Sequence, residues 1–269
     1  MSDISATEPT AITAPSSPPV PISVERVSHV FDTGTPRAHQ VLYDIDLVLN
    51  ERRVGIIGHN GSGKSTLIRM LDGLIQPTSG HISVAGYDTV REAKEVRRST
   101  GFIFTDPDHQ IIMPTVREDV AFSLRRSGLT KAALDAKVDE TLARFGLSES
   151  AEKPAHLLSG GQKQLLALAA VLITEPTLLL ADEPTTLLDI RNTRMFASLI
   201  ADLPQSIVMA THHLSLLTGF DRVVVFDEGR VVADGTPTEA ITYYKRLMDT
   251  ELALRNPTTD SREPSRERT

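Results

Sequence analysis

Residues 58–66 read GHNGSGKST, and this segment gives the strongest structural signal in the chain. It matches the pattern G-x-x-x-x-G-K-[S/T] in the context that the pattern requires, after the short apolar run RRVGIIG and before STLIRMLDGL, whose apolar residues have helical spacing. The glycines let the backbone wrap closely round phosphate oxygens, while successive N–H groups and the next helix N-terminus supply donors and a positive dipole. A glycine-rich turn that binds nothing is the alternative, but strand, loop and helix together favour a phosphate-binding loop.

Two side chains of this loop add a charge and a metal ligand. Lys64 is expected to lie beside the β- and γ-phosphates of a nucleotide, and the Ser65 hydroxyl is expected to ligate Mg²⁺. The residues expected to bind the nucleotide here are Gly58, His59, Asn60, Gly61, Ser62, Gly63, Lys64, Ser65 and Thr66.

Polar residues follow two later apolar runs, where ligands of open α/β sheets bind. In TLLLADEP, Asp182 is expected to hold Mg²⁺ through water, and Glu183 is expected to act as the general base on the attacking water. In MATHH, His212 is expected to hydrogen-bond the γ-phosphate and that water. Two acids at a strand end are commonly only solvated, and a lone histidine is commonly structural. The upstream phosphate loop favours the functional interpretation.

A second anion-binding helix start is predicted at LLSGGQKQ, where Ser159, Gly160 and Gly161 precede a helical run. One chain rarely needs two anion-binding helix N-termini for a single γ-phosphate. A head-to-tail dimer, in which each subunit closes its neighbour's site, does need both.

Composition limits the class of protein. The net charge of −7 argues against a nucleic-acid partner, and the absence of cysteine excludes disulfides and thiolate metal sites. The longest apolar run, LLALAAVLI, is about half of what a membrane helix needs, and the N-terminus lacks the pattern of a signal peptide.

The order of patterns predicts one α/β domain. Residues 1–21 are expected to be a disordered tail, residues 22–247 the domain with a helical part at about 106–160, and residues 248–269 a helix end and a second disordered tail. Alternating strands come first, amphipathic helices occupy the middle, and RVVVFD pairs with RVVADG across a tight turn. The helix in TKAALDAKVDETLARFG is expected to begin after Thr130 and to end at Gly146.

With these motifs, the chain resembles the ABC-type ATPases from about Ile22 to about Tyr244. The resemblance rests on GHNGSGKST, LSGGQ, LLLADEP, the TTLLD that ends in Asp189, and THH. It implies a P-loop NTPase fold with a mostly parallel core sheet, an N-terminal antiparallel β-subdomain and an α-helical insert. It also implies ATP and Mg²⁺ as ligands, Lys64, Glu183 and His212 as catalytic residues, and a two-subunit clamp. The remaining nucleotide contacts that it implies are Phe31, stacked on adenine, and Ser159, Gly160, Gly161 and Gln162, which face the other subunit.

Thr105 departs from the family pattern, because most of these ATPases have a glutamine there that reaches Mg²⁺ and the attacking water. A hydroxyl is shorter, so Thr105 is expected at most to contact the metal through a bridging water. The following DPDHQIIMPTVREDVAFSL resembles the energy-coupling-factor importers, whose corresponding second glutamine, here Gln110, faces the docking groove of the membrane coupling subunit. Within that branch FTDPDHQ and ADEPTTLLD look most like biotin-uptake ATPases, with cobalt and nickel ATPases next.

The loop after Thr105 has alternative interpretations. Asp106, Asp108 and His109 form either a metal site or, as we favour, a solvated turn capped by aspartate. The apolar residues 111–113 either contact a partner with Gln110 or pack under the helical insert.

The function expected from these features is ATP-driven uptake of a micronutrient, with biotin favoured. The expected partners are a second ATPase subunit, forming a homodimer, an integral-membrane coupling subunit and a substrate-binding membrane subunit, with no nucleic acid. The chain would then lie peripherally on the cytoplasmic face of the inner membrane. The alternative from another class is an ABC ATPase that acts as a regulatory or assembly switch without a transporter.

Overall fold

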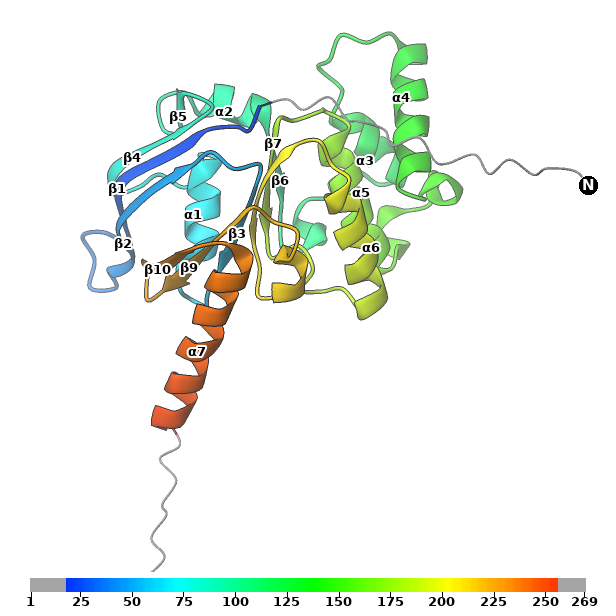
Figure 1. Cartoon of the computed structure of the whole chain (residues 1–269). Helices are drawn as coiled ribbons and strands as arrows, with labels where there is room; N and C mark the ends of the chain where they lie inside the picture. The colour runs from blue at the N-terminus through cyan, green and yellow to red at the C-terminus, as the bar shows by residue number, and fades with distance from the viewer. Residues whose placement is uncertain (1–17, 256–269) are drawn as a thin grey trace, which may run out of the picture.

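The computed structural model describes residues 18–255, and two sheets organise them (Figure 1). The first sheet is antiparallel and has the strand order β2-β1-β4-β5. Its strands are β1 (Ile22–Phe31), β2 (His39–Leu49), β4 (Ser79–Val84) and β5 (Tyr87–Asp88). Apolar and polar residues alternate along β1 and β2, so one face of this sheet is buried and the other faces solvent.

The second sheet is the core sheet and has the order β10-β9-β3-β8-β7-β6. Its strands are β3 (Arg53–Ile57), β6 (Thr100–Ile103), β7 (Leu178–Asp182), β8 (Ser206–Ala210), β9 (Arg222–Asp227) and β10 (Arg230–Gly235). All neighbours pair in parallel except β9 and β10, which form the predicted hairpin. The carboxyl ends of β3, β7 and β8 therefore meet at one edge of the sheet.

Helix α1 (Lys64–Leu71) follows β3 and the phosphate loop, and it lies between the two sheets (Figure 1). Most of its side chains are buried, in the cluster that also holds the inward-facing residues of both sheets. Burial on both sides fixes the start of this helix, so the phosphate loop that precedes it has a rigid support.

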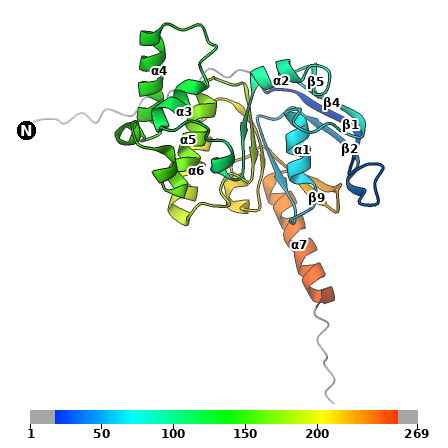
Figure 2. The same ribbon diagram turned by 180° about the vertical axis from the view of Figure 1, so that it is seen from behind.

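The helical part forms a separate lobe beside β6 (Figures 1 and 2). It contains the short turns η1 (Pro107–His109), η2 (Ser148–Ser150) and η3 (Ala155–Leu157), and the helices α3 (Val116–Phe122), α4 (Lys131–Arg144) and α5 (Gly160–Leu172). The Thr130 hydroxyl caps α4 as predicted, and Thr115 caps α3 in a reciprocal pair with Glu118. Helix α5 ends at Leu172, before the turn that leads to Pro176.

The sequence patterns did not identify two helices, α2 (Ala93–Ser99) and α6 (Ile190–Ala201). Helix α2 buries only Val96 and so lacks a wide apolar face, whereas α6 packs Phe196, Leu199 and Ile200 on the core at helical spacing. Two further elements complete the described residues: the turn η4 (Leu214–Leu217) and helix α7 (Pro237–Arg255), which projects from the body in both views (Figures 1 and 2).

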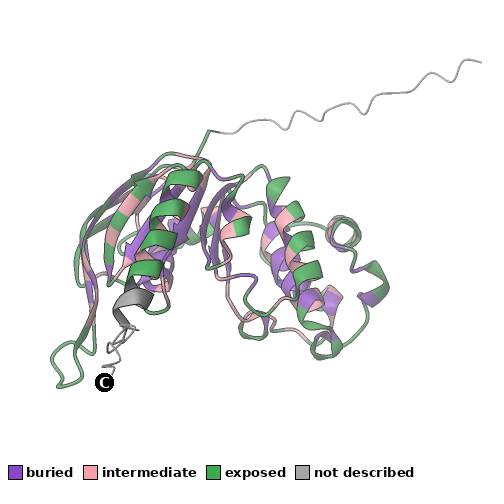
Figure 3. Ribbon diagram, turned by 60° about the horizontal axis from the view of Figure 1, so that its bottom comes forward, coloured by how far each residue is buried: buried purple, intermediate pink, exposed green. Residues whose placement is uncertain are grey.

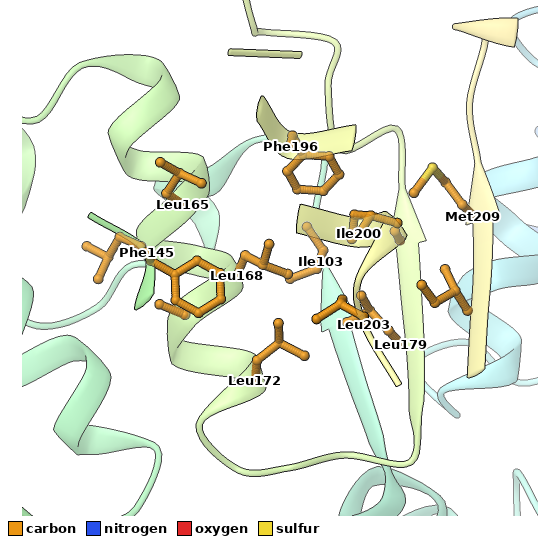
Figure 4. Close-up of a cluster of buried hydrophobic side chains, with 14 of the residues drawn as sticks. Ile103, Phe145, Leu165, Leu168, Leu172, Leu179, Phe196, Ile200, Leu203 and Met209 are labelled. Atoms are coloured by element: carbon orange, nitrogen blue, oxygen red, sulfur yellow. The ribbon is translucent and has the colours of Figure 1, made fainter. Parts of the chain in front are cut away.

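The buried residues concentrate on the strands of the core sheet and on the facing sides of the helices (Figure 3). The second cluster joins α5 to the core sheet: Leu165, Leu168 and Leu172 of α5 lie toward Phe145 on one side and Ile103 on the other (Figure 4). The helical lobe is thus packed on the sheet through α5, the helix that begins with the LSGGQ motif.

These observations confirm the predicted fold class: an α/β P-loop fold with a mostly parallel core sheet, an antiparallel N-terminal sheet and a helical insert. Among residues 18–255 no helix is long and apolar enough to cross a bilayer. The predicted tails fall mostly outside the described residues. In the parts of the tails that are described, the Val20 N–H donates to the Ser206 hydroxyl at 3.0 Å, and α7 extends through residues 248–255.

Candidate nucleotide-binding and hydrolysis site

The phosphate loop connects the end of β3 to α1 and is held tightly by its neighbours. A Cβ on Gly58 would lie 2.2 Å from the Phe226 carbonyl oxygen, so only glycine fits between the loop and β9. The Gly229 N–H donates to the Ser62 carbonyl, which fastens the loop to the β9–β10 turn. These contacts fix the shape of the loop.

Lys64 is the first residue of α1 and is 5% exposed. Its ammonium group donates to the carbonyls of Gly58 and His59 at 2.8 and 2.9 Å. Burial lowers the pKa of Lys64, and the carboxylates of Glu183 and Asp182 partly offset that effect. The arrangement places a fixed positive charge in the loop, on the side of the two acids that end β7.

The loop and β7 supply donors and acceptors that fit a nucleotide with Mg²⁺. The Ser65 hydroxyl donates to Asp182 Oδ1 at 2.6 Å, so the two predicted metal ligands lie side by side. The Ser62 hydroxyl is buried on the side of the loop that faces the Phe226 carbonyl of β9. Hard oxygen ligands such as those of Ser65 and Asp182 suit Mg²⁺.

Asp182 is fully buried and is held on several sides. Besides Ser65, the Arg69 guanidinium of α1 lies 3.2 Å from Asp182 Oδ2. The Thr105 hydroxyl donates to the Asp182 backbone carbonyl at 2.8 Å. The motifs predict Ser65 and Thr105 near the metal but give no signal for Arg69, which lies four residues after Ser65 on α1 and so on the same helix face.

Glu183 and His212 lie together at the ends of β7 and β8. Glu183 Oε2 lies 2.7 Å from His212 Nδ1 and also accepts the backbone N–H of His212 at 3.2 Å. Glu183 has a φ of 51°, in the left-handed region that a non-glycine residue seldom adopts. This backbone turn directs the carboxylate from the strand end toward His212.

The second histidine of the THH motif has a different environment. His213 Nδ1 lies 2.8 Å from the Thr185 hydroxyl, and the two histidine rings are 4.2 Å apart. Burial, followed by the charge of His212, lowers the pKa of His213. His213 therefore links β8 to the loop after Glu183, a role for which the sequence gives no signal beyond the paired histidines.

The LSGGQ motif starts α5 as predicted. Ser159 caps the helix, with its hydroxyl accepting the Gln162 N–H at 3.3 Å and the Gln162 side chain accepting the Ser159 N–H at 3.0 Å. A Cβ on Gly161 would lie 2.4 Å from the Asn192 side chain, so α6 approaches this end of α5 closely. Ser159 and Gly160 are exposed, and this helix start is accessible to a ligand or to another chain.

The remaining predicted nucleotide contacts lie at the edges of the site. Phe31 ends β1, packs edge-on against His29 with ring centres 4.4 Å apart, and is 40% exposed. The His59 side chain points to β9, with Nε2 3.1 Å from Asp227. Asn60 and Gly61 are exposed, and Thr66 is buried on α1.

The loop after Thr105 is a capped turn. Asp106 accepts the Asp108 N–H at 2.9 Å, as expected for the solvated-turn interpretation. No group of three or more His, Asp and Glu residues able to hold a metal occurs among the described residues.

Gln110 is half-buried and connects β6 to α5. It accepts the Phe104 N–H at 3.3 Å and donates to the Ala167 carbonyl at 3.2 Å. Of the apolar residues that follow, Ile111 packs against the core, whereas Ile112 is 62% exposed. Partner contact by Gln110 stays a prediction, and Ile112 is the more accessible side chain of this loop.

Fold and site together define a P-loop NTPase. Residues 42–186 match the family model described as ABC transporter, and the chain belongs to that family. The chain is an ABC ATPase, which binds ATP with Mg²⁺ and hydrolyses the ATP. It is the ATP-binding subunit of an importer of the ABC and energy-coupling-factor type. ABC ATPases form dimers and work with membrane components.

Several relatives cover most of the chain. It is 47% identical over 210 residues to the biotin transport ATP-binding protein BioM of Rhizobium etli, covering 78% of this chain and 93% of that one. It is 38% identical over 226 residues to the energy-coupling factor transporter ATP-binding protein EcfA1 of Caldanaerobacter subterraneus, covering 81% of each. The structure of CbiO1 of Clostridium perfringens, part of the ABC transporter complex CbiONQ, superposes with a TM-score of 0.72 at 33% identity, covering 88% of this chain and 95% of that one.

Proposed function

We propose that this chain is the energy-coupling ATPase of a membrane importer for biotin. The proposed ATPase activity rests on one observation: Ser65, Asp182 and Glu183 lie together at one sheet edge, beside the phosphate loop. The similarity to BioM supports biotin as the cargo. A cobalt or nickel importer is the second candidate, which the similarity to CbiO1 supports.

The proposed reaction is in-line attack of water on the γ-phosphoryl group of ATP. Glu183 accepts the proton of the water, and His212, 2.7 Å from Glu183, holds water and phosphate in line. Lys64 and the loop N–H groups offset the charge that develops on the phosphoryl oxygens. Ser65 and Asp182 hold Mg²⁺, which adds positive charge beside the phosphates when bound.

Two subunits would form each complete site. The exposed helix start at Ser159 and Gly160 supplies N–H donors to an anion, and the Gln162 side chain is already used as the cap. In the proposed homodimer these groups face the γ-phosphate on the phosphate loop of the other chain. Phe31 provides an exposed aromatic face for the adenine.

The decisive variant for hydrolysis is Glu183→Gln. It keeps the shape of the side chain and removes the base, so we expect ATP binding and ATP-dependent dimerisation to persist while turnover falls by ~100-fold or more. Turnover, nucleotide affinity and sedimentation are measured on the same preparation. Lys64→Ala is the matched variant, and it should lose affinity instead. Near-normal turnover of Glu183→Gln would remove Glu183 from its role.

The proposed transport function places the chain peripherally on the cytoplasmic face of the membrane, bound to a coupling subunit and a substrate-binding subunit. The tagged chain is purified from detergent-solubilised membranes of its own organism, and the captured membrane proteins are tested for binding of radiolabelled biotin, Co²⁺ and Ni²⁺. Biotin binding supports the proposal, and metal binding supports the second candidate. Recovery of the ATPase alone would favour the switch without a transporter.

A further inference from the structure

We propose that Thr105 is a positioning residue that fixes the peptide between Asp182 and Glu183, and that it is not a ligand of Mg²⁺. This inference rests on the roles proposed above for those two acids. It concerns the position at which the chain departs from the glutamine of its family.

The first observation is where the hydroxyl of Thr105 donates its proton. The paired residues of β6 and β7 end at Ile103 and Ala181. Thr105 lies two residues beyond, and its Oγ1 donates to the carbonyl of Asp182 at 2.8 Å. A side chain thus continues the pairing of the two strands after their backbones have separated.

The second observation is that the same peptide is held from its other side. The N–H of Glu183 belongs to the peptide whose carbonyl is that of Asp182, and it donates to the Ala210 carbonyl of β8 at 2.9 Å. Thr105 and Ala210 therefore clamp one peptide plane between two strands. A peptide plane fixed at both its polar groups cannot rotate without losing a hydrogen bond.

The third observation is that the backbone needs this clamp here. Glu183 has a φ of 51°, which is unfavourable for a residue with a Cβ and persists only where the surroundings fix it. Rotation of the peptide would swing the Asp182 carboxylate away from Ser65, 2.6 Å away, and the Glu183 carboxylate away from His212. The Thr105 hydroxyl consequently contributes to the directions of both acids, together with the Ala210 carbonyl.

The geometry also accounts for a hydroxyl in place of glutamine. The Thr105 side chain is short, and the hydrogen bond that it donates to the Asp182 carbonyl holds its hydroxyl at the backbone. Asp182 itself is already directed by Ser65 on one oxygen and by Arg69 on the other. Holding the peptide needs a short donor, whereas reaching a metal from this position would need the longer side chain.

Steady-state kinetics of three variants test the proposal. Thr105→Val keeps the volume and removes the donor, so we expect kcat to fall about tenfold, with KM for ATP within about twofold. Thr105→Ser keeps the hydroxyl and should restore most of the rate. Thr177→Val is the matched control, because the Thr177 hydroxyl donates to the Ser99 carbonyl at 3.1 Å across the opposite ends of the same two strands. It should leave kcat unchanged.

A second readout does not depend on turnover. The chain has no cysteine, so Thr105→Cys introduces its single thiol. Cadmium NMR of this variant with Cd²⁺ and ATP should show oxygen ligands only. A sulfur-ligated cadmium would place residue 105 on the metal and overturn the proposal, even if Thr105→Val fails to fold.

The proposal would also be overturned if Thr105→Val hydrolysed ATP as fast as wild type. It would be overturned as well if Thr105→Ser were as slow as Thr105→Val. Glu183→Gln is assayed alongside. Normal turnover in that variant would defeat the proposed role of Glu183, whereas lost turnover there with a normal Thr105→Val would defeat only the positioning role.

Discussion

The two adjacent histidines of the THH motif, His212 and His213, make different contacts. His212 contacts the proposed base, whereas His213 is bonded to Thr185 and sits among His212, Glu183 and the start of η4. Because burial lowers the pKa of His213 below its usual 6.5, the unfolded chain takes up a proton before the folded chain does as the pH falls. Folding is then opposed by protonation, and stability decreases below about pH 6.5.

We expect the free energy of unfolding to fall between pH 7.5 and pH 5.5, and His213→Gln to make this fall smaller. The fall should not vanish, because burial also lowers the pKa of His29. Urea unfolding at the two pH values measures the effect, and the exposed His156→Gln serves as the control. An unchanged slope in His213→Gln would contradict the assignment.

The residue types at the site could be predicted from the sequence, but their hydrogen bonds could not. Lys64, Ser65, Asp182 and Glu183 follow from motifs whose chemistry dictates the residue types. The bond from Thr105 to a backbone carbonyl depends on where β6 and β7 separate, and no local pattern encodes that point.

At the scale of elements, the turn η1 with its following residues connects the sheet to α5 and also reaches the surface. Lys163 of α5 bonds both oxygens of Asp108, at 2.7 and 2.9 Å, so the turn is attached to the helix of the LSGGQ motif. Ile112, just beyond, is exposed. A partner that docks on this segment would therefore be connected to α5.

We expect Ile112→Asp to leave the ATPase rate of the isolated subunit within about twofold and to weaken capture of the membrane partners. A charge at the centre of an apolar contact is costly, while the same charge in water is not. Co-purification and turnover are measured in parallel, with Leu129→Asp, another exposed apolar residue, as the control. Equal capture by wild type and Ile112→Asp would remove this surface from the docking site.

Not every element with a clear sequence signal is among the predicted ones. The β9–β10 hairpin has a turn signal between two apolar strands. Helix α6 was missed, although Asp189 caps it by accepting the Asn192 N–H at 2.7 Å. That cap is a usable signal, but the resemblance accounts for Asp189 as the end of the TTLLD motif without indicating a helix.

At the scale of the whole molecule, Arg222 joins the two sheets. It donates to the Val48 carbonyl of β2 at 2.7 Å, contacts Glu51, and forms two bonds with Asp234 of β10. The bonds to Asp234 raise the pKa of Arg222, so it stays charged throughout the usual pH range.

We expect Arg222→Met to lower the free energy of unfolding by about 2 kcal/mol, since it leaves two carboxylates and a carbonyl without their partner. Arg98→Met is the control: its pair with Glu95 lies on the surface and should contribute less than about 0.5 kcal/mol. Urea denaturation compares the two. Equal losses would show that Arg222 acts only as another surface charge.

The strand order also determines when the molecule can be assembled during its synthesis. Strand β3, which carries the phosphate loop, lies between β8 and β9, yet β3 ends at Ile57 and β9 ends at Asp227. At ~5–20 residues per second, the ribosome needs roughly 10 to 30 s to make the intervening chain. Until β8 ends at Ala210, β3 has neither of its core-sheet neighbours, and it gains the second only when β9 is made. The full support of the loop, and with it stabilisation by ATP, therefore comes late in synthesis.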